Sequence, residues 1–364
     1  MLSVAGLGRN VRRAYKFLSN TYNEGDEIFI FGFSRGSYTA RSLVGYLSVV
    51  GLIDRESLTP EAESRAWYFY RTNPGDRLLS ISDDIRRNAY SIRIKLLGVF
   101  DTVGALGIPL GTFWRENRDL FEFHDVGLSP LVDVCLHAVA IDEHRESFQA
   151  TLWRKPKFEA IAANAEQTWF AGAHSDVGGG YVDATARQIP ATKSLDDITL
   201  DWMLRRVTAL YKDFPVAKPG NDGKRAPAWR ITDSTWSTAE QHETRLGLYR
   251  LTPHAWRSIG NIASASKNWP REVDVCFDRH SEAAGERIHC SAIERLGRET
   301  PSGSKSLCYA PRNLINALGL QATSLVCVPK VKVVDWSGEE MSKTEADALI
   351  SQARTRLLEA QLLF

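Results

Sequence analysis

The sequence predicts an α/β fold, a mostly parallel β-sheet with helices on both of its faces. Three short apolar runs have the β-branched and aromatic residues of buried strands, at residues 27–31, 92–100 and 168–171. Stretches with helical periodicity separate these runs, and strands that alternate with helices pair in parallel. Each run leads into glycines and polar residues, at the sheet edge where parallel sheets place their sites.

The first half of the chain begins with a predicted amphipathic helix over residues 9–22, where apolar residues recur at helical spacing. A turn ends this helix, and the first strand follows over residues 27–31 and ends at Gly32. Small and apolar residues then predict a helix over residues 37–50, and the second strand runs over residues 92–100. This half therefore supplies two strands and two helices to the predicted fold.

The second half contains two helix starts with the pattern of a capping box, in which a serine and an acidic residue three positions later bond each other's backbone. Ser194 opens one helix, which we expect to run to about Tyr211, and Ser342 opens the last helix. Prolines, glycines and charged residues fill residues 212–245. This composition predicts an excursion over the surface.

The chain has 364 residues, of which 43% are hydrophobic, enough for one large domain or two smaller ones. We expect one domain over residues 1–320, and a C-terminal strand and helix over residues 321–364. Lysine and arginine number 45 against 44 aspartates and glutamates, which gives a net charge of +1. Without a basic surplus the chain has little means to neutralise phosphates, so we expect no nucleic-acid partner.

No segment has the pattern of a membrane span or a signal peptide. The longest apolar stretch, residues 43–53, is shorter than the roughly 20 residues that a bilayer requires. Residues 1–21 contain basic residues and no apolar core. We therefore expect a cytoplasmic protein, or one exported without a signal peptide. The five cysteines are scattered, which fits a reducing compartment, and we predict no metal and no cofactor.

The first strand leads into a G-x-S-x-G motif, formed by Gly32, Ser34 and Gly36. In a nucleophile elbow, a strand delivers the serine to a sharp turn and a helix follows it. Both flanks are predicted here, and we expect the two glycines to relieve the crowding of the turn. The sequence therefore predicts Ser34 as a nucleophile. The helix that starts near Arg35 would direct its amide towards an oxyanion, so we predict that this amide contributes to the oxyanion hole.

A serine nucleophile needs a base, and His174 follows the third predicted strand in a glycine-rich stretch. We predict His174 as the general base; its alternative role is a hydrogen bond to a loop carbonyl. His289 is the second candidate, in surroundings that indicate a helix start. The other histidines have no comparable position at a strand end: His124, His137, His144, His242, His254 and His280.

The acid that orients the base should be buried at a neighbouring strand end. Asp101 fits by its position after the second strand, and its alternative role is to accept backbone amides in a turn. Asp176, two residues from His174, and Asp142 are the alternative acids. A metal site of His174 and Asp176 is disfavoured, because two ligands in one loop are too few to define one.

Five ordered segments of this sequence resemble the α/β-hydrolase family known as domain of unknown function 2235, which bacterial type VI secretion phospholipase effectors contain. The similarity covers roughly residues 7–320 and implies an α/β-hydrolase-like sheet and a serine esterase or lipase, with Ser34 at the nucleophile position. It also implies a lipid ester or small-molecule ester substrate, a peripheral contact with membranes, and a secretion-system or immunity protein as partner. The segments that carry the resemblance are residues 8–15, 25–41, 98–107, 137–143 and 170–181.

Members of that family begin with a strand that ends in an Asp-Gly-Thr motif, and an early loop of this kind usually supplies the second oxyanion amide. Here 26 residues precede Glu27 and hold one predicted helix. We therefore expect a sheet that lacks the N-terminal strands, with an uncovered edge that lowers solubility. An active ester hydrolase is the first functional hypothesis. A catalytically impaired α/β module that serves binding or interaction is the alternative.

Overall fold

A computed structural model describes most of the chain. Of the eight histidines, His124 and His280 lie outside the described residues. The described residues are 4–72, 74–77, 85, 87–103, 128–155, 164–181, 193–216, 231, 234–251, 254–260, 272–274, 283–303, 305–320 and 331–363.

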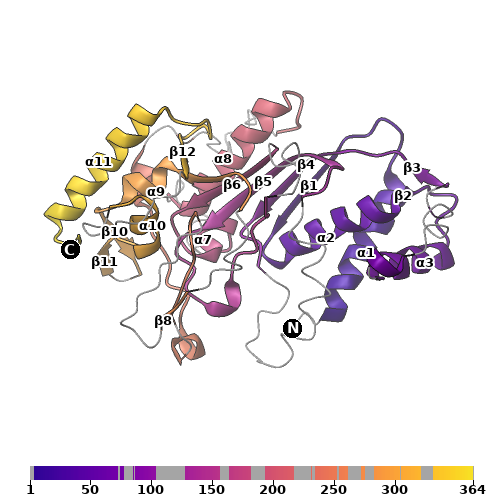
Figure 1. The fold of residues 1–364 in the computed structure, drawn as a ribbon, viewed down its shortest axis with the longest axis horizontal. Coiled ribbons are helices and arrows are strands. Elements are labelled where there is room, and N and C mark those ends of the chain that lie inside the picture. Colours follow the sequence, from indigo (N-terminus) through magenta and orange to yellow (C-terminus); the bar gives the residue numbers. More distant parts are fainter. Residues whose placement is uncertain are drawn as a thin grey trace, which may run out of the picture. The chain divides into compact units, whose positions relative to one another are not determined.

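A six-stranded sheet forms the centre of the fold, with helices around it (Figure 1). Its strand order is β1 (Ile28–Phe33), β4 (Ile94–Phe100), β5 (Val132–Ala140), β6 (Ala165–Phe170), β9 (Glu286–His289) and β12 (Lys332–Val334). The pairs β1 with β4, β6 with β9 and β9 with β12 are parallel. The predicted α/β fold is therefore confirmed, and β1, β4 and β6 are the three predicted strands.

Two strands of this sheet, β5 and β9, have no counterpart in the sequence prediction. Asp133 and His137 interrupt the apolar run of β5. The strand β9 contains only four residues, too few for a periodic pattern. The strand β12 lies within residues 321–364, where a C-terminal strand is predicted. The strand β1 stands at one end of the strand order, next to β4.

The chain forms two compact units. The first contains residues 1–137 and 151–165, and the second contains residues 138–150 and 166–364. The predicted division at residue 320 differs from these boundaries and stays a prediction.

Helices of the first unit lie close to the predicted positions. The helix expected over residues 9–22 begins earlier, and the helix expected over residues 37–50 begins directly after Ser34. The elements of this unit outside the central sheet include α1 (Val4–Thr21), α2 (Arg35–Val50), α3 (Pro60–Arg71), β2 (Leu52–Ile53), β3 (Ala89–Tyr90) and the 3₁₀ turn η1 (Pro74–Asp76).

Two buried groups of the first unit connect α1 to its neighbours. The hydroxyl of Tyr15 donates to the carbonyl oxygen of Gly51 and accepts the N–H of Ile53, both at 3.0 Å. The carboxylate of Glu63 on α3 is 1% exposed and accepts hydrogen bonds from Arg12 Nε at 2.8 Å and Arg12 Nη2 at 2.5 Å. Tyr15 therefore connects α1 to the residues that follow α2, and the Arg12–Glu63 ion pair connects α1 to α3.

The second unit holds the remaining helices and several short strands. Its elements include η2 (Glu146–Phe148), α7 (His174–Gly178), α8 (Leu195–Leu210), η3 (Ser234–Thr238), η4 (Gly247–Leu251), β7 (His254–Trp256), β8 (Glu272–Asp274), α9 (Cys290–Arg295), β10 (Glu299–Ser302), β11 (Lys305–Cys308), α10 (Arg312–Ala317) and α11 (Lys343–Glu359).

The two predicted capping boxes have different outcomes. At α11, Ser342 accepts the N–H of Glu345 and Glu345 accepts the N–H of Ser342, so this box is confirmed. At α8, Ser194 is the N-cap residue, but its side chain caps no backbone amide and donates to Asp196 instead. The helix is therefore correct and the capping box wrong, because a nearer carboxylate takes the serine hydroxyl.

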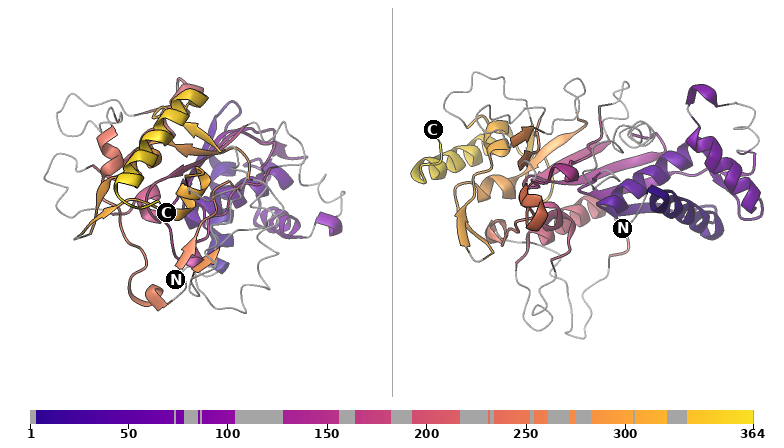
Figure 2. Two further views of the ribbon diagram at one scale, coloured as in Figure 1. Left: turned by 60° about the vertical axis from the view of Figure 1, so that its left-hand side comes forward. Right: turned by 90° about the horizontal axis from the view of Figure 1, so that it is seen from below.

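The C-terminal helix α11 packs on α9 (Figures 1 and 2). Ala353 and Leu357 of α11 are fully buried. The guanidinium of Arg356 donates to the carbonyl oxygens of Leu296, at 2.8 Å, and Ile293, at 3.1 Å. The carbonyl oxygen of Ile293 also accepts the N–H of Leu296, so Arg356 reinforces the C-terminal end of α9.

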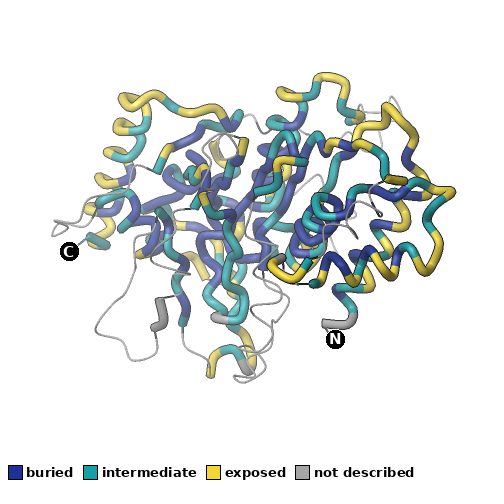
Figure 3. The backbone as a smooth tube through the Cα atoms, turned by 45° about the vertical axis from the view of Figure 1, so that its right-hand side comes forward, coloured by how far each residue is buried: buried dark blue, intermediate teal, exposed yellow. Residues whose placement is uncertain are grey.

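Buried residues concentrate along the strands, and the outer turns of the helices are exposed (Figure 3). Among the largest side chains withdrawn from solvent are Trp153, Trp169 and Trp202. Within the described part of the chain, no helix combines the length and the apolar character that a membrane span requires.

Candidate active site

Ser34 lies on a sharp turn between β1 and α2, as the motif predicts. It is the N-cap residue of α2, and its backbone has a φ of 58° and a ψ of −123°. Its N–H donates to the carbonyl oxygen of Phe100, at the end of the neighbouring strand β4, at 3.0 Å. A positive φ is strained for a residue with a Cβ, and such strain is common where a side chain has to be presented for chemistry.

The two glycines of the motif differ in what the turn requires of them. A Cβ added to Gly32 would lie 2.7 Å from the carbonyl oxygen of Gly36 and 2.7 Å from the nitrogen of Ser37. A Cβ added to Gly36 would meet no atom within 4 Å. The expectation that both glycines relieve crowding is therefore correct for Gly32 and wrong for Gly36, because the chain at Gly36 has already turned into the helix.

Ser37 and Arg35 complete the turn. The hydroxyl of Ser37 is buried and lies 2.7 Å from the carbonyl oxygen of Gly32 and 2.9 Å from that of Phe100, so it bridges the ends of β1 and β4. Arg35 is exposed and is the first residue of α2. Its amide therefore belongs to the helix N-terminus, where backbone N–H groups attract negative charge. The oxyanion role of this amide stays a prediction.

Asp101 follows β4 and is fully buried, with a φ of 37°. Because Phe33 pairs with Phe100, the residues that follow them, Ser34 and Asp101, come from neighbouring strand ends of the first unit. Beyond Asp101, the N–H of Thr102 donates to Nε2 of His137 at 3.1 Å. The structure thus brings the predicted nucleophile and the first predicted acid to one edge of this unit.

His174 belongs to the second unit. It begins the short helix α7 directly after the Gly172 turn, and its side chain is buried. Its ring meets the ring of Phe148 edge-on, with the ring centres 5.1 Å apart. The glycine-rich stretch that follows β6 is therefore partly helical.

Asp176, an alternative acid in the sequence prediction, forms an ion pair with a different histidine. Its Oδ1 lies 2.6 Å from the ring Nδ1 of His242. Its Oδ2 accepts a hydrogen bond from the backbone N–H of His242 at 3.1 Å. Oδ2 also accepts the N–H of Ala173 at 2.9 Å. The hydrogen bond to Asp176 raises the pKa of His242. A buried carboxylate that holds one nitrogen of a partly exposed imidazole is the arrangement that orients a catalytic base.

Further side chains surround this Asp176–His242 pair. The ring of Tyr181 stacks on His242, with ring centres 3.7 Å apart and planes 11° from parallel. Glu143 is buried and accepts two hydrogen bonds from the guanidinium of Arg145 and one from its backbone N–H, and it also accepts a hydrogen bond from the hydroxyl of Thr244 at 3.2 Å. The guanidinium of Arg145 lies over the ring of Phe148. The second unit therefore gathers two histidines, two carboxylates and aromatic rings in one region.

Asp142, the other alternative acid, is fully enclosed. It accepts the N–H of Gly172 at 2.7 Å and the hydroxyl of Tyr309 at 2.8 Å. Burial raises its pKa to about 7. These contacts give Asp142 a role in holding the turn that precedes His174.

His289, the alternative base, is fully buried at the N-cap of α9, as its surroundings in the sequence indicate. Its Nδ1 lies 2.7 Å from the hydroxyl of Ser291, and its ring stacks on Phe170. Burial lowers its pKa to about 3, so the ring stays neutral. This environment suits a helix cap.

His242 is the member of this pair to which the sequence analysis gives no role. It lies in the stretch predicted as a surface excursion, yet Ser237 and Ala239 just before it are buried. The buried guanidinium of Arg295 donates to the carbonyl oxygens of both, at 2.7 and 2.8 Å. Asp176 and His242 are 66 positions apart, so no local pattern could have revealed the pair.

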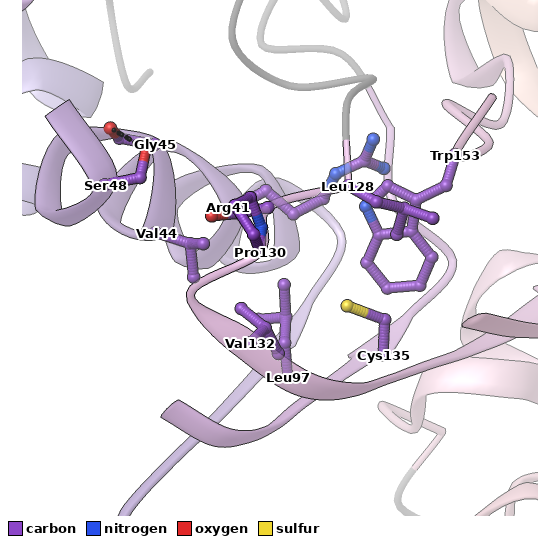
Figure 4. Close-up of a pocket in the computed structure, with 11 residues that line it drawn as sticks. Arg41, Val44, Gly45, Ser48, Leu97, Leu128, Pro130, Val132, Cys135 and Trp153 are labelled. Atoms are coloured by element: carbon purple, nitrogen blue, oxygen red, sulfur yellow. Dashed lines mark hydrogen bonds between the residues drawn. The ribbon is translucent and has the colours of Figure 1, made fainter. Parts of the chain in front are cut away.

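A separate cavity of about 200 Å³ lies in the first unit (Figure 4). Its lining includes Val44 and Ser48 of α2, Cys135 of β5, and Trp153. The guanidinium of Arg41 stands 5.0 Å from the centre of the Trp153 ring. Burial raises the pKa of Cys135 to about 12, so its thiol is protonated and unreactive. Among the described residues, no group of three or more His, Cys, Asp and Glu side chains is arranged to hold a metal ion.

The fold and the turn at Ser34 together define an α/β protein with a serine presented after the first strand of a parallel sheet. Residues 2–206, more than half of the chain, match the family described as "T6SS, Phospholipase effector Tle1-like, catalytic domain". The chain belongs to this family of catalytic domains.

Individual relatives match smaller parts. "Uncharacterized protein YEL023C" of Saccharomyces cerevisiae is 29% identical over an alignment of 153 residues, and the match covers 39% of this chain and 21% of that protein. The chain thus spans about a fifth of the length of this curated relative.

Two solved structures have low TM-scores and low sequence identity with this chain. A crystal structure of an uncharacterized protein from Pseudomonas aeruginosa has a TM-score of 0.33 and 22% identity, covering 57% of this chain and 27% of that one. The Tle1 effector bound to the VgrG spike of the type 6 secretion system has a TM-score of 0.28 and 21% identity, covering 49% and 31%.

Proposed function

We propose that this protein is a serine esterase of the α/β-hydrolase type that cleaves carboxylic esters of glycerophospholipids. Membership of a family of phospholipase effector catalytic domains supports the substrate class. The single observation that carries the serine mechanism is the strained backbone of Ser34 between β1 and α2.

In the proposed reaction, the Ser34 hydroxyl attacks the ester carbonyl while a histidine accepts its proton. The Arg35 amide at the start of α2 stabilises the oxyanion. The intermediate expels the lysolipid alcohol, which takes the proton from the histidine. Water then attacks the acyl-enzyme, with the same histidine as base, and releases the fatty acid.

Within the second unit, we propose His242 as the candidate base and Asp176 as the acid that orients it. The 2.6 Å contact between these side chains and the burial of Asp176 support the assignment, because a buried carboxylate fixes the tautomer of an imidazole and stabilises its cation. The alternative is the pair that the sequence predicts, His174 with Asp101, whose support is the position of each after a strand of the sheet.

A secretion-system partner is part of the proposal, since the solved Tle1 effector is bound to a VgrG spike. Cytoplasmic localisation and export without a signal peptide remain the two expectations for where the protein acts.

A fluorophosphonate probe tests the nucleophile, because it labels only an activated serine. We expect labelling of the parent protein, none of Ser34→Ala, and loss of nearly all fatty-acid release from phospholipid micelles in that variant. A folded parent that takes up no probe and releases no fatty acid would contradict the proposal and favour a non-catalytic binding module.

A second set of variants identifies the base. We expect His242→Gln and Asp176→Asn to lower kcat by about 10²- to 10⁴-fold, the usual effect of removing such a group. His174→Gln and Asp101→Asn should lower kcat by less than about tenfold, an effect small enough to come from altered packing near the site. The reverse order would return the role to His174 and Asp101.

A further inference from the structure

Two leucines are exposed at the ends of one short turn of the second unit. The 246–251 turn consists of Leu246 and the 3₁₀ element η4. Leu246 is 55% exposed, and Leu251, at 82%, has the largest exposed fraction of any large hydrophobic side chain among the described residues. Single exposed leucines are ordinary, but here two lie within six residues of one short turn.

Contacts of the second unit anchor this turn beside the Asp176–His242 pair. Leu246 follows His242 by four residues, and between them Thr244 donates to the buried Glu143. Within the turn, the ring of Tyr249 lies 5.4 Å from the Arg145 guanidinium and 6.3 Å from the centre of the Phe148 ring. The leucines therefore project from a segment that is held to the region of the proposed base.

The charges around the leucines suit an anionic surface. Arg245 precedes Leu246, and Arg250, which is exposed, precedes Leu251. Nη2 of Arg245 donates to the carbonyl oxygen of Arg250, at 3.5 Å. One negative side chain is close, because the exposed Glu243 accepts the N–H of Arg245. Arginines beside exposed apolar residues commonly hold lipid phosphates while the apolar groups enter the acyl region.

We propose that the 246–251 turn docks the protein on anionic phospholipid bilayers, with Leu246 and Leu251 in the outer acyl region and Arg250 at the phosphates. A bilayer fits this turn better than a protein partner does. Specific protein interfaces bury about 1,200–2,000 Å², far more than two leucines present. This docking proposal rests on the proposed function in one respect: docking would serve to bring lipid esters to the region of His242.

Sedimentation with vesicles tests the docking. The vesicles contain phosphatidylglycerol and phosphatidylcholine, or phosphatidylcholine alone, and the protein carries Ser34→Ala so that the lipid stays intact. We expect Leu246→Ser with Leu251→Ser to weaken binding by about tenfold for each leucine. This is roughly the affinity that a leucine side chain contributes when most of it moves from water into the acyl region. Arg250→Gln should weaken binding to the phosphatidylglycerol vesicles more than binding to the phosphatidylcholine vesicles, whose surface carries no net charge.

A matched control uses two other exposed leucines of the same unit, Leu307 on β11 and Leu358 on α11, each 54% exposed. Leu307→Ser with Leu358→Ser should bind vesicles as the parent does. The proposal fails if the parent does not bind vesicles, if the Leu246 and Leu251 substitutions leave binding unchanged, or if the control substitutions reduce it equally.

An activity measurement separates this proposal from the proposed function. With Ser34 restored, Leu246→Ser and Leu251→Ser should lower the hydrolysis of vesicle lipid at least tenfold and leave the hydrolysis of a soluble short-chain ester unchanged. Vesicle binding without hydrolysis of either ester would contradict the proposed function and support the docking surface. Hydrolysis of both esters at unchanged rates in the double variant would contradict the docking surface alone.

Discussion

Ser34 adopts a backbone conformation that residues with a Cβ rarely occupy, and the turn tolerates it because Gly32 leaves room for the chain to fold back. The close approach of the Gly36 carbonyl and the Ser37 nitrogen fills the space where a Gly32 Cβ would stand. The bridging hydroxyl of Ser37 holds the same turn from the other side. The presentation of the serine therefore depends on the smallest residue at position 32.

A pair of alanine substitutions tests this dependence. Gly32→Ala should lower the free energy of unfolding by about 3 kcal/mol or more, because backbone atoms 2.7 Å away have to move. Gly36→Ala should change it by less than about 1 kcal/mol, because its Cβ meets nothing and alanine favours a helix. Urea unfolding of both variants provides the comparison. Equal stabilities would contradict the geometry of the turn.

The Asp176–His242 pair gives the pH dependence of catalysis a definite direction. A general base has to be neutral, so activity should fall as the pH drops through the raised pKa of His242. Asp176→Asn removes the hydrogen bond that raises this pKa, so the acidic limb of the kcat/KM profile should shift to lower pH while the plateau falls. An acidic limb that does not move would show that His242 is not the titrating base.

What the sequence reveals at this scale depends on distance along the chain. Ser34 is predictable because its strand, its turn and its helix are consecutive. The sequence predicts Asp176 as an alternative acid, and it predicts no role for His242 because this residue follows no predicted strand. Their pairing needs Arg295 to hold Ser237 and Ala239 inside the unit, a contact that spans more than 50 residues.

At the scale of elements, the connection between α1 and α3 depends on a buried charge. Glu63 is 1% exposed and lies 3.3 Å from Lys16 in addition to its two bonds with Arg12. Burial raises the pKa of Glu63, but the hydrogen bonds and the charge of Arg12 outweigh it and leave the pKa lowered. A carboxylate with a lowered pKa stabilises the fold above its unfolded pKa, and this contribution is lost as the pH falls through the folded pKa.

Arg12→Gln should therefore destabilise the protein mostly at neutral pH. We expect a loss of about 1–3 kcal/mol in the free energy of unfolding at pH 7, since a buried carboxylate loses its main partner. The loss should shrink at acid pH, where Glu63 becomes protonated. Arg9→Gln, an exposed arginine of the same helix, is the matched control and should have little effect at either pH. A pH-independent loss would mean that Arg12 acts through packing alone.

The capping boxes show why one pattern predicts helices better than it predicts contacts. Ser342 and Ser194 both precede helices, and both carry an acidic residue three positions later. At α8 a second acidic residue, Asp196, lies within reach and takes the hydroxyl of Ser194. The helix forms in both places because the apolar positions that follow pack into the core.

For the whole molecule, the α/β class follows from strands whose apolar pattern is local, and it was predictable for that reason. The strands β5 and β9 were not, because interior polar residues hide β5 and its short length hides β9. The division of the chain at residues 137, 150 and 165 depends on contacts between distant segments and has no signature in composition.

The outer position of β1 predicts where charge improves solubility. Phe31 on β1 is 44% exposed, and a lysine there would oppose edge-to-edge association of sheets. We expect Phe31→Lys to lower light scattering in concentrated solution. Phe17→Lys removes an even more exposed ring, at 66%, but from α1, and it should have the smaller effect. An equal effect of both would point to general hydrophobicity in place of the strand edge.

The strand β5 belongs to both units, since residues 132–137 are in the first and residues 138–140 in the second. During synthesis on a ribosome, the first unit cannot finish before residue 165 has emerged. Ala138 to Ile141, which are fully buried in the finished protein, wait longer still for the partners that follow residue 165. The side chain of Asn313, which donates to the carbonyl oxygen of Ile141, follows that residue by 172 positions. At about 5–20 residues per second, this stretch takes on the order of 10–35 s to appear. A late segment of the chain therefore completes the end of an early strand.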